Sequence, residues 1–566
     1  MSRRHCPAAV VAASIALLAA FDGGYAPTSW GWTAVAGLWL AVLALLLRSP
    51  LAVDRSGVAA LAALLVLSGW TAASLLWTTS APRTMLELQR DLAYVGVVSC
   101  IVLLAGRERR SLLFGLGAGA AAVGLYALGE YFLASPAIDR FQGYLLFRPI
   151  GYANTLGALL AIALPVVLGL AAHGSTRFVR CDAFGTVVPL ACALYLTQSR
   201  AAWLGLAVGL VVWIARTNAP GRAVTVIAAC GVPAASGVAL VRLLDLLDAH
   251  APPADRGTRA GLAAGAVVAL SVAAAALEGP ARRFDLPRAR VTPIVVAGAA
   301  AIAAAAAVAM THLGDRRLYW RVAWEMFERH PLLGAGAGTF ESYWLELREV
   351  DIGVRDAHNL YLETAAELGL VGLALLVALL ATPILSARAD RDPLVTAALG
   401  GYSAFLVHAA FEWDWEMPIV TLPALLLGCV LALSRKSEVV VSRAPRGAAA
   451  AAAVTLAGLS AVGLVGHTFL ATAQRRAVAG AYDDATLSAR RATRFLPWSG
   501  EAWLVRGGLR ARLGEPATAR DAYLQGLRRD DRDWRLWYEL SLVATGEERQ
   551  VALRHAAKLN PVLFRR

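Results

Sequence analysis

Long apolar runs separated by short polar loops dominate the chain up to about residue 471. A helix needs about 20 mostly apolar residues to cross a hydrocarbon layer of about 30 Å, so these runs predict membrane-spanning helices. The predicted spans are Pro7–Phe21, Gly31–Leu47, Val58–Trp77, Leu92–Ala105, Leu112–Leu133, Ile150–Ala171, Ala183–Leu196, Ala201–Ile214, Val224–Leu240, Gly261–Leu277, Val291–Met310, Leu360–Leu385, Leu394–Phe411, Ile419–Leu433 and Ala448–Ala471. The expected fold is an all-α, polytopic transmembrane helix bundle.

The pattern changes after about residue 475, where charged residues alternate with apolar positions at helical spacing. Trp503 and Trp537 lie one tetratricopeptide period apart, about 34 residues. Ala517–Leu527 resembles the second helix of such a repeat, and Leu553–Pro561 resembles the start of another. We therefore predict a tetratricopeptide-like helical tail, with a generic helical hairpin as the alternative.

Composition supports the membrane assignment. The chain is 58% hydrophobic and 16% charged, whereas soluble domains are roughly 45–50% apolar and about 25% charged. The net charge of +13 is almost all arginine, since Lys436 and Lys558 are the only lysines. Nucleic-acid binding is one reading of a basic chain, but arginines in short loops between spans are better explained by membrane topology. The six cysteines are scattered and predict no disulfide and no metal site.

Arginine placement predicts the orientation. With Arg3 and Arg4 inside, the inside loops include the basic segments 48–55, 107–110, 177–180, 216–222, 282–290, 388–391 and 435–446. The outside loops carry fewer arginines: Arg83, Arg90, Arg140, Arg148, Arg200, Arg242 and Arg256. This is the positive-inside pattern. It places the long loop 311–357 and the tail outside the cytoplasm.

Four parts follow from these patterns. Residues 1–149 form N-terminal spans, and 150–434 form a transmembrane core that includes the extracytoplasmic loop 311–357. Residues 435–474 form a basic linker with the last span, and 475–566 form the tail.

Ionisable side chains near the outer ends of the spans are the candidate site residues: Arg148, Arg200, Arg321, His358, Glu412 and Asp414. Such groups are costly at membrane depth and are therefore usually functional. Arginine grips phosphate oxygens through a planar fork of donors, so several arginines facing one cavity suit a diphosphate. His358 is expected at a helix N-terminus, where the helix dipole disfavours protonation. A neutral imidazole can accept a proton, which makes His358 the candidate general base.

Each of these residues also has a simpler reading. Arg148 and Arg200 fit contacts with lipid headgroups, His358 fits a structural hydrogen bond, and Glu412 and Asp414 fit a solvated turn. The run Gly334–Gly338 is not a phosphate loop, because no strand precedes it and no Lys-Ser/Thr follows it. It is expected to end the amphipathic stretch Leu318–Arg329 and turn the chain.

Four stretches resemble the O-antigen ligase and polymerase superfamily of bacterial membrane proteins. They are Arg148–Asn154, Ser199–Trp203, Arg321–Gly336 and His358–Gly372, and the last two are the most specific. The resemblance implies a GT-C-like glycosyltransferase fold and a donor glycan on a polyprenyl diphosphate. It also implies metal-independent and nucleotide-independent chemistry, with no cofactor.

The same resemblance assigns roles to residues. It implies that Arg200 and Arg321 bind the donor diphosphate, with Arg148 as a possible third contact, and that His358 is the base. An acidic residue after His358 is also implicated, and Glu412 or Asp414 is the nearest match.

The expected function is transfer of a glycan, with inversion, to an acceptor hydroxyl of a glycolipid, glycan or protein. The expected location is the bacterial cytoplasmic membrane, where the protein contacts membrane lipids and its tail could bind a protein partner. A polymerase of lipid-linked repeat units is the first alternative. A transporter or flippase is the second, although no clear inverted repeat is visible. A non-catalytic scaffold is the third.

Overall fold

The computed structural model describes residues 6–105, 108–134, 139, 141–247, 253–311, 313–433 and 438–565. Each predicted span coincides with a helix: α1 (Cys6–Ala20), α2 (Pro27–Leu47), α3 (Arg55–Ala73), α4 (Ala81–Cys100), α5 (Arg109–Leu133), α6 (Ala153–His173), α7 (Arg177–Thr197), α8 (Arg200–Arg216), α9 (Pro220–Leu243), α10 (Pro253–Ala276), α12 (Arg288–Thr311), α15 (Leu360–Ala387), α16 (Pro393–His408), α17 (Pro418–Ala432) and α18 (Arg443–Val478). Within the described residues, ten helices are long and apolar enough to cross a membrane, and α1, α16 and α17 are shorter apolar helices. The all-helical, polytopic fold is confirmed.

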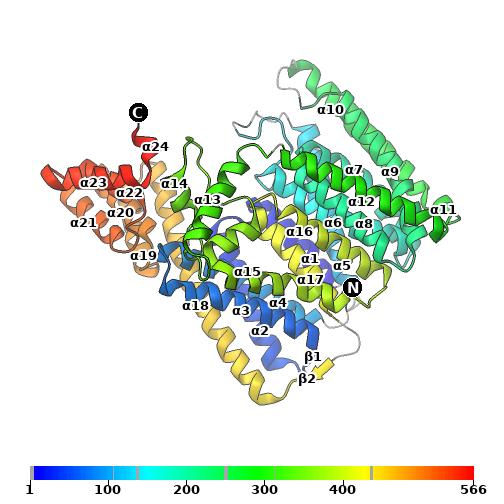
Figure 1. The fold of residues 1–566 in the computed structure, drawn as a ribbon, viewed down its shortest axis with the longest axis horizontal. Helices are drawn as coiled ribbons and strands as arrows, with labels where there is room; N and C mark the ends of the chain where they lie inside the picture. Colours follow the sequence, from blue (N-terminus) through cyan, green and yellow to red (C-terminus); the bar gives the residue numbers. More distant parts are fainter. Residues whose placement is uncertain are drawn as a thin grey trace.

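The remaining elements are short. They are η1 (Asp22–Gly24), η2 (Ser74–Leu76), the π-helical turn η3 (Ile101–Ala105), α11 (Glu278–Ala281), α13 (Arg316–Arg329), α14 (Phe340–Leu347), η4 (Asp414–Glu416), and the strands β1 (Ala52–Asp54) and β2 (Glu438–Val440). The two strands pair antiparallel, with Ala52 opposite Val440. They join the α2–α3 connection to the segment before α18, at what we call the strand end of the bundle (Figure 1).

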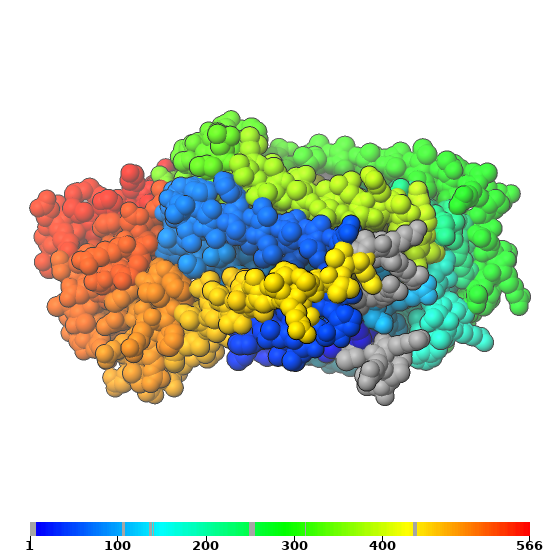
Figure 2. Space-filling model, turned by 90° about the horizontal axis from the view of Figure 1, so that it is seen from below, coloured from blue at the N-terminus to red at the C-terminus, as the bar shows by residue number. Residues whose placement is uncertain are grey.

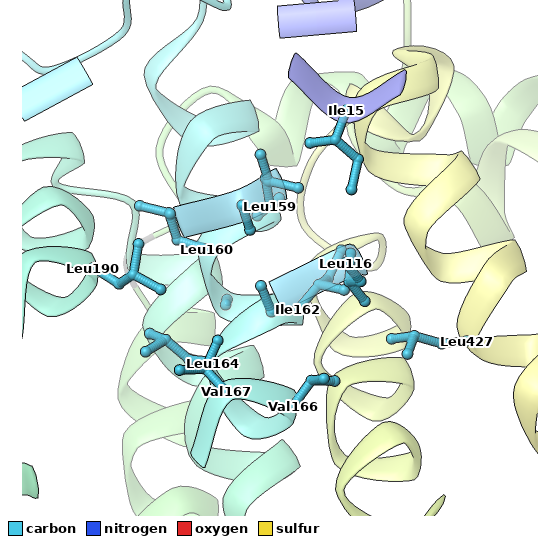
Figure 3. Packing of buried hydrophobic residues seen from close by; sticks show 14 of the residues in the cluster. Ile15, Leu116, Leu159, Leu160, Ile162, Leu164, Val166, Val167, Leu190 and Leu427 are labelled. Atoms are coloured by element: carbon cyan, nitrogen blue, oxygen red, sulfur yellow. The ribbon is translucent and has the colours of Figure 1, made fainter. Parts of the chain in front are cut away.

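The core is built around α6, which is apolar on all sides and buried along almost its whole length. Leu159, Ile162 and Val166 of α6 belong to one apolar cluster with Leu116 of α5 and Leu427 of α17 (Figure 3). A helix that is apolar all round belongs in the interior of a bundle. At the other extreme, α12 is exposed along most of its length and packs mainly on α8.

Small residues let α8 and α16 approach closely. A Cβ atom added to Gly400 of α16 would lie 2.6 Å from the carbonyl oxygen of Gly209 in α8, so a larger residue would push the helices apart. Small residues are common at helix contacts in membranes for this reason. This contact fixes Arg200, at one end of α8, relative to the turn that follows α16.

At the strand end, arginine side chains of one loop bond to residues of a neighbouring loop or helix end. Arg109 pairs with Asp390 at 2.9 Å, and the guanidinium of Arg391 donates to the carbonyl oxygen of Arg216 at 3.0 Å. Arg446 donates to the carbonyl oxygen of Leu45 at 2.9 Å. The predicted inside arginines among the described residues are therefore gathered at one end. Arg3, Arg4, Arg107, Arg140, Arg435 and Lys436 lie outside the described residues.

The opposite end, the loop end, carries residues 313–359. Their position depends on a break in α15 at Gly369, where the backbone has a φ of 68° and the Leu332 backbone lies against the glycine. The glycine is needed there, because a side chain would clash with Leu332. Around the break, Ala335 donates to the carbonyl oxygen of Ala366 at 3.1 Å, and Leu370 donates to that of Pro331 at 2.9 Å. The loop is thus bonded directly to α15.

The tail consists of α19 (Tyr482–Phe495), α20 (Gly500–Arg512), α21 (Pro516–Leu527), α22 (Trp534–Val543), α23 (Gly546–Leu559) and α24 (Pro561–Phe564). Figure 2 shows it, in orange to red, at one end of the molecule and joined to the rest through α18. The helices α20 and α21 coincide with the predicted hairpin, and Leu553–Pro561 covers the end of α23 and the start of α24. The tetratricopeptide assignment stays a prediction, as does the 474/475 boundary, which falls inside α18.

Polar contacts tie the tail to the loop end. The Ser80 hydroxyl donates to Asp530 at 3.0 Å, and Arg348 donates to the Asn560 side chain at 2.9 Å. Arg348 is buried. The tail is therefore docked on the same end of the bundle as the candidate site.

Candidate active site

A cavity of about 850 Å³ opens at the loop end between α6, α8, α12 and α13. Its polar part is formed by Asn154, Gln198, Arg200, Arg316 and Glu412. An apolar part continues between two helices and is lined by Trp203, Leu204 and Ala207 of α8 and by Ala301, Ile302, Ala305 and Val308 of α12. One cavity therefore offers fixed charges at one end and a hydrocarbon surface at the other.

Arg200 lies in this cavity, as the first residue of α8. The turn before it is tight, because Gln198 adopts a left-handed φ of 54° and the Ser199 hydroxyl caps α8 by accepting from the Ala202 amide. The Arg200 side chain is exposed, and no ion pair is found for it within the described residues. A guanidinium placed this way can meet an anionic ligand.

Arg316, at the start of α13, is a cavity residue that sequence reasoning missed. Its Nε donates to the carbonyl oxygen of Phe411 at 2.8 Å, and its Nη2 forms an ion pair with Glu412. The helical spacing was a usable signal. Arg316 precedes the buried Tyr319 by three residues and the buried Ala323 by seven, so it lies on the inward face of α13.

Glu412 is buried, and it faces the cavity beside Arg316. Burial raises the pKa of this carboxyl, while Arg316 acts in the opposite direction. The Tyr152 hydroxyl donates to Glu412 at 3.4 Å, and the Asn154 amide donates to that hydroxyl at 3.0 Å. The motif at 148–154 thus contributes Tyr152 and Asn154 to the cavity region.

Arg321 and Arg148 lie elsewhere. Arg321 is on the exposed side of α13 and pairs with Glu349 at 3.0 Å. Arg148 pairs with Glu130 at 3.0 Å and lines a separate cavity of about 210 Å³ with Tyr131 and Tyr144. The structure does not bring either side chain to the cavity that holds Arg200.

His358 is held in the last turn before α15, next to the cap residue Asn359. Its backbone φ is 55°, and its ring lies 5.2 Å from the ring of Tyr319. The carbonyl oxygen of Asp356 lies 3.0 Å from Nδ1, and because a carbonyl can only accept, Nδ1 carries the proton. In the neutral ring, Nε2 therefore keeps a lone pair.

The charge state of His358 suits a base. Its pKa is lowered to about 4, mainly by burial and also by Arg316, against the opposing effects of the Asp356 carbonyl and of Asp414. The imidazole is thus neutral at physiological pH. Tyr319 and Arg316 lie on the same face of α13, so this helix brings His358 near Arg316, although His358 is not among the residues that line the cavity.

Asp414 is fully buried and pairs with His408 of α16 at 3.0 Å. It anchors the turn that carries Glu412, since both partners come from opposite sides of that turn. The solvated turn considered for Asp414 and Glu412 does not match this burial.

The buried Asp414–His408 pair predicts a stability effect. Asp414→Ala is expected to lower the free energy of unfolding by about 3 kcal/mol, because removing one partner leaves a buried polar group unpaired. Thermal unfolding in detergent measures this. As a control, Asp390→Ala removes the partly exposed partner of Arg109 and should cost about 1 kcal/mol or less. Equal effects of the two substitutions would contradict a structural role for the Asp414 pair.

A second group of charges lies behind the site, around a smaller cavity of about 150 Å³. It contains Glu87, Arg90, Glu363, Glu367 and Glu416. Arg90 pairs with Glu416 at 2.7 Å. Glu367 accepts from the amides of Gly338 and Phe340 at 2.8 and 2.9 Å, so the glycine run wraps a carboxylate of the protein itself.

Sequence reasoning missed this acidic group as well. A usable signal was the pair Glu363 and Glu367, four residues apart at the start of an apolar span. Carboxylate oxygens of Asp356, Glu363 and Glu416 lie within 4.8 Å of one another, an arrangement that could hold a cation. The pKa of the Glu416 carboxyl is lowered, because Arg90 and Arg355 outweigh the opposite effect of burial. The expectation of metal-independent chemistry stays a prediction.

The fold and the site define a multi-pass membrane protein with a cationic cavity and a neutral histidine at one end of its helical bundle. Residues 185–377 match the O-antigen ligase family (Wzy_C), so the chain carries a domain of that family. The matched segment runs from α7 into α15 and contains Arg200, Arg316, Arg321 and His358; Arg148, Glu412 and Asp414 lie outside it. The resemblance is thereby confirmed for residues 185–377, which include three of the four stretches; Arg148–Asn154 lies outside the match. Family members are membrane enzymes of the O-antigen ligase or polymerase type that act on lipid-linked glycans. No curated protein matches the chain.

Proposed function

We propose that the protein is a glycosyltransferase that moves a glycan from a polyprenyl diphosphate carrier to an acceptor hydroxyl at the extracytoplasmic membrane face. The observation that carries this proposal is the shape of the cavity. Its polar end offers Arg200 and Arg316, and its apolar end runs between α8 and α12. A lipid with an anionic diphosphate head and a hydrocarbon tail is divided into a polar and an apolar part in the same way.

The donor diphosphate lies against Arg200 and Arg316, whose guanidinium groups can each donate two parallel hydrogen bonds. Arg316 exchanges part of its contact with Glu412 for the diphosphate. Arg321, which lies on the outer side of α13, and Arg148, near the separate cavity, remain candidates for contacts with the more distant glycan.

The acceptor hydroxyl gives its proton to Nε2 of His358, and its oxygen attacks the anomeric carbon. The bond between that carbon and the phosphate oxygen breaks, and the diphosphate leaves with the electron pair. The arginines offset the charge that develops on the leaving group. A direct displacement inverts the anomeric centre. No nucleotide is needed, because the carrier diphosphate is an activated leaving group, and no metal takes part in the scheme.

The pH dependence of kcat/KM tests the role of His358. With a pKa lowered to about 4, the free base persists well below the usual histidine value of about 6.5. Protonation removes the base, so kcat/KM is expected to stay level from neutral pH down to about pH 5 and to fall through about pH 4. A profile that breaks near pH 6.5 would argue that another group sets the rate.

Transfer itself is tested with purified protein in vesicles that contain a labelled lipid-linked glycan. We expect free polyprenyl diphosphate and a glycosylated acceptor to appear together. Transfer onto a glycolipid or protein acceptor indicates a ligase, whereas growth of the carrier-linked chain indicates the polymerase alternative. Movement of intact donor across the bilayer without cleavage would favour a flippase and overturn the proposal.

The proposed location is the bacterial cytoplasmic membrane, with the loop end and the tail extracytoplasmic. The clustering of arginines at the strand end supports this orientation. Labelling of a cysteine placed beside His358 by an impermeant reagent, in intact spheroplasts, is the direct test.

A further inference from the structure

Four arginines form a basic patch at the base of the tail, here called the arginine foot: Arg490, Arg491 and Arg494 of α19 and Arg506 of α20. The three on α19 are exposed. Within the described residues, none of the four forms an ion pair, whereas the tail arginines Arg510, Arg520, Arg532 and Arg535 do. The foot is therefore an uncompensated positive patch.

The foot is also internally repulsive. Burial lowers the pKa of Arg506, and the neighbouring Arg510 and Arg490 lower it further. Arg506 lies over the ring of Trp503 at 4.9 Å, and Arg491 lies over the ring of Phe469 at 5.4 Å. Aromatic faces thus orient two of the guanidiniums, but no carboxylate neutralises them. An anionic ligand would relieve the repulsion.

The position of α18 across the membrane shows how far the arginine foot lies from the strand end. Arg446 contacts the backbone of Leu45 at the strand end. Since about 20 helical residues cross a hydrocarbon layer of about 30 Å, the opposite boundary falls near Gly466. In agreement, Leu464 packs against Gly31, close to the start of α2.

The next helix, α19, runs back along α18 toward that boundary. The Phe495 ring lies 5.8 Å from the Phe469 ring, and Leu496 packs against Gly466. Trp498 joins the same apolar cluster. Tryptophan is enriched where a membrane meets water, as Trp498 would be here. The C-terminal half of α19, with Arg490, Arg491 and Arg494, therefore lies at the level of lipid headgroups.

We propose that the arginine foot binds the headgroups of anionic phospholipids and so holds the tail against the membrane beside the loop end. Guanidinium forks match phosphate oxygens, and an anionic surface attracts arginines within about 8 Å at physiological salt. This inference does not depend on the reaction proposed above. It concerns a surface of the tail, which lies outside the matched family segment.

Hydrogen–deuterium exchange of the full chain in nanodiscs tests the proposal. Nanodiscs of phosphatidylcholine alone are compared with nanodiscs that also contain phosphatidylglycerol. We expect phosphatidylglycerol to slow exchange in the segment 485–506, and high salt to reverse the effect. In the variant Arg490→Gln/Arg494→Gln, the loss of two contacts should weaken headgroup binding by about thirtyfold and remove the protection.

A matched control is Arg549→Gln/Arg554→Gln, which removes the same charge. Both residues are exposed and lie on α23, which packs on α22, α24 and α14. This control should keep the full response to phosphatidylglycerol. The proposal fails if phosphatidylglycerol leaves exchange unchanged in the natural chain, or if both double variants respond alike. Protection by soluble glycerol phosphate equal to that by the lipid would also overturn it, because the membrane surface would then be unnecessary.

Discussion

Replacing His358 by asparagine is expected to lower the rate of glycan transfer by about 10²–10⁴-fold, the usual contribution of a positioned general base. The reason is the free Nε2 lone pair of a buried, neutral imidazole. Asparagine offers no comparable base at neutral pH. The rate is measured under single-turnover conditions with a labelled lipid-linked donor, so that product release does not mask the chemical step.

Asparagine is preferred to alanine because of the backbone at this position. The φ of 55° lies in the left-handed region, which asparagine adopts more readily than most other residues. His358→Asn therefore tests the imidazole with little added backbone strain. Equal expression and thermal stability of the variant should confirm this.

The matched control for this substitution is His330→Asn. His330 ends α13 and its Nε2 lies 3.2 Å from the Tyr343 hydroxyl, whereas His358 lies beside Tyr319, on the face of α13 that carries Arg316. We expect nearly unchanged transfer. Full activity in His358→Asn, or equal losses in both variants, would remove His358 from the proposed reaction.

The spans could be predicted because a bilayer demands long apolar runs, and each run became a helix. The broken α15 was less visible. Leu368 and Leu370 flank Gly369 in a helical pattern, and only the packing of the Leu332 backbone shows why the helix is interrupted there. Contacts between distant segments, such as Gly209 with Gly400, also depend on tertiary packing that periodicity does not encode.

The site was only partly predictable, and α13 shows why. Successive helical residues turn by about 100°, so residues five apart differ by about 140°. Arg316 and Arg321 therefore face different directions: Arg316 shares the face of Tyr319, while Arg321 meets Glu349. A motif locates the helix, but the row of buried residues along one face of α13 decides which arginine faces the cavity.

The buried acidic group has a different cause. Glu87 and Arg90 come from α4, Glu363 and Glu367 from α15, and Glu416 from the turn after α16. None of these charged residues stands out when its own segment is considered alone. Their meeting depends on how three distant segments pack, which a single sequence does not reveal.

The arginine pair of the cavity gives the other large expected effect. Arg200→Lys and Arg316→Lys should each lower kcat/KM by about 10²-fold, comparable to the loss of one donor to a developing anion. Lysine keeps the charge but has no planar fork, so it cannot hold two diphosphate oxygens at once. Lysine is also the safer choice at position 316, because it leaves a cation beside the buried Glu412.

Arg321→Lys is the matched comparison. It changes the same chemistry on the same helix, but at an exposed position that pairs with Glu349. We expect a change of less than about threefold, as for a partly exposed ion pair. Donor binding, measured with a fluorescent lipid diphosphate, should weaken in the first two variants and stay near normal in this one. If Arg321→Lys lost as much activity as Arg316→Lys, the exposed face of α13 would have to contact the donor diphosphate. The assignment of the diphosphate to the cavity between α8 and α12 would then be wrong.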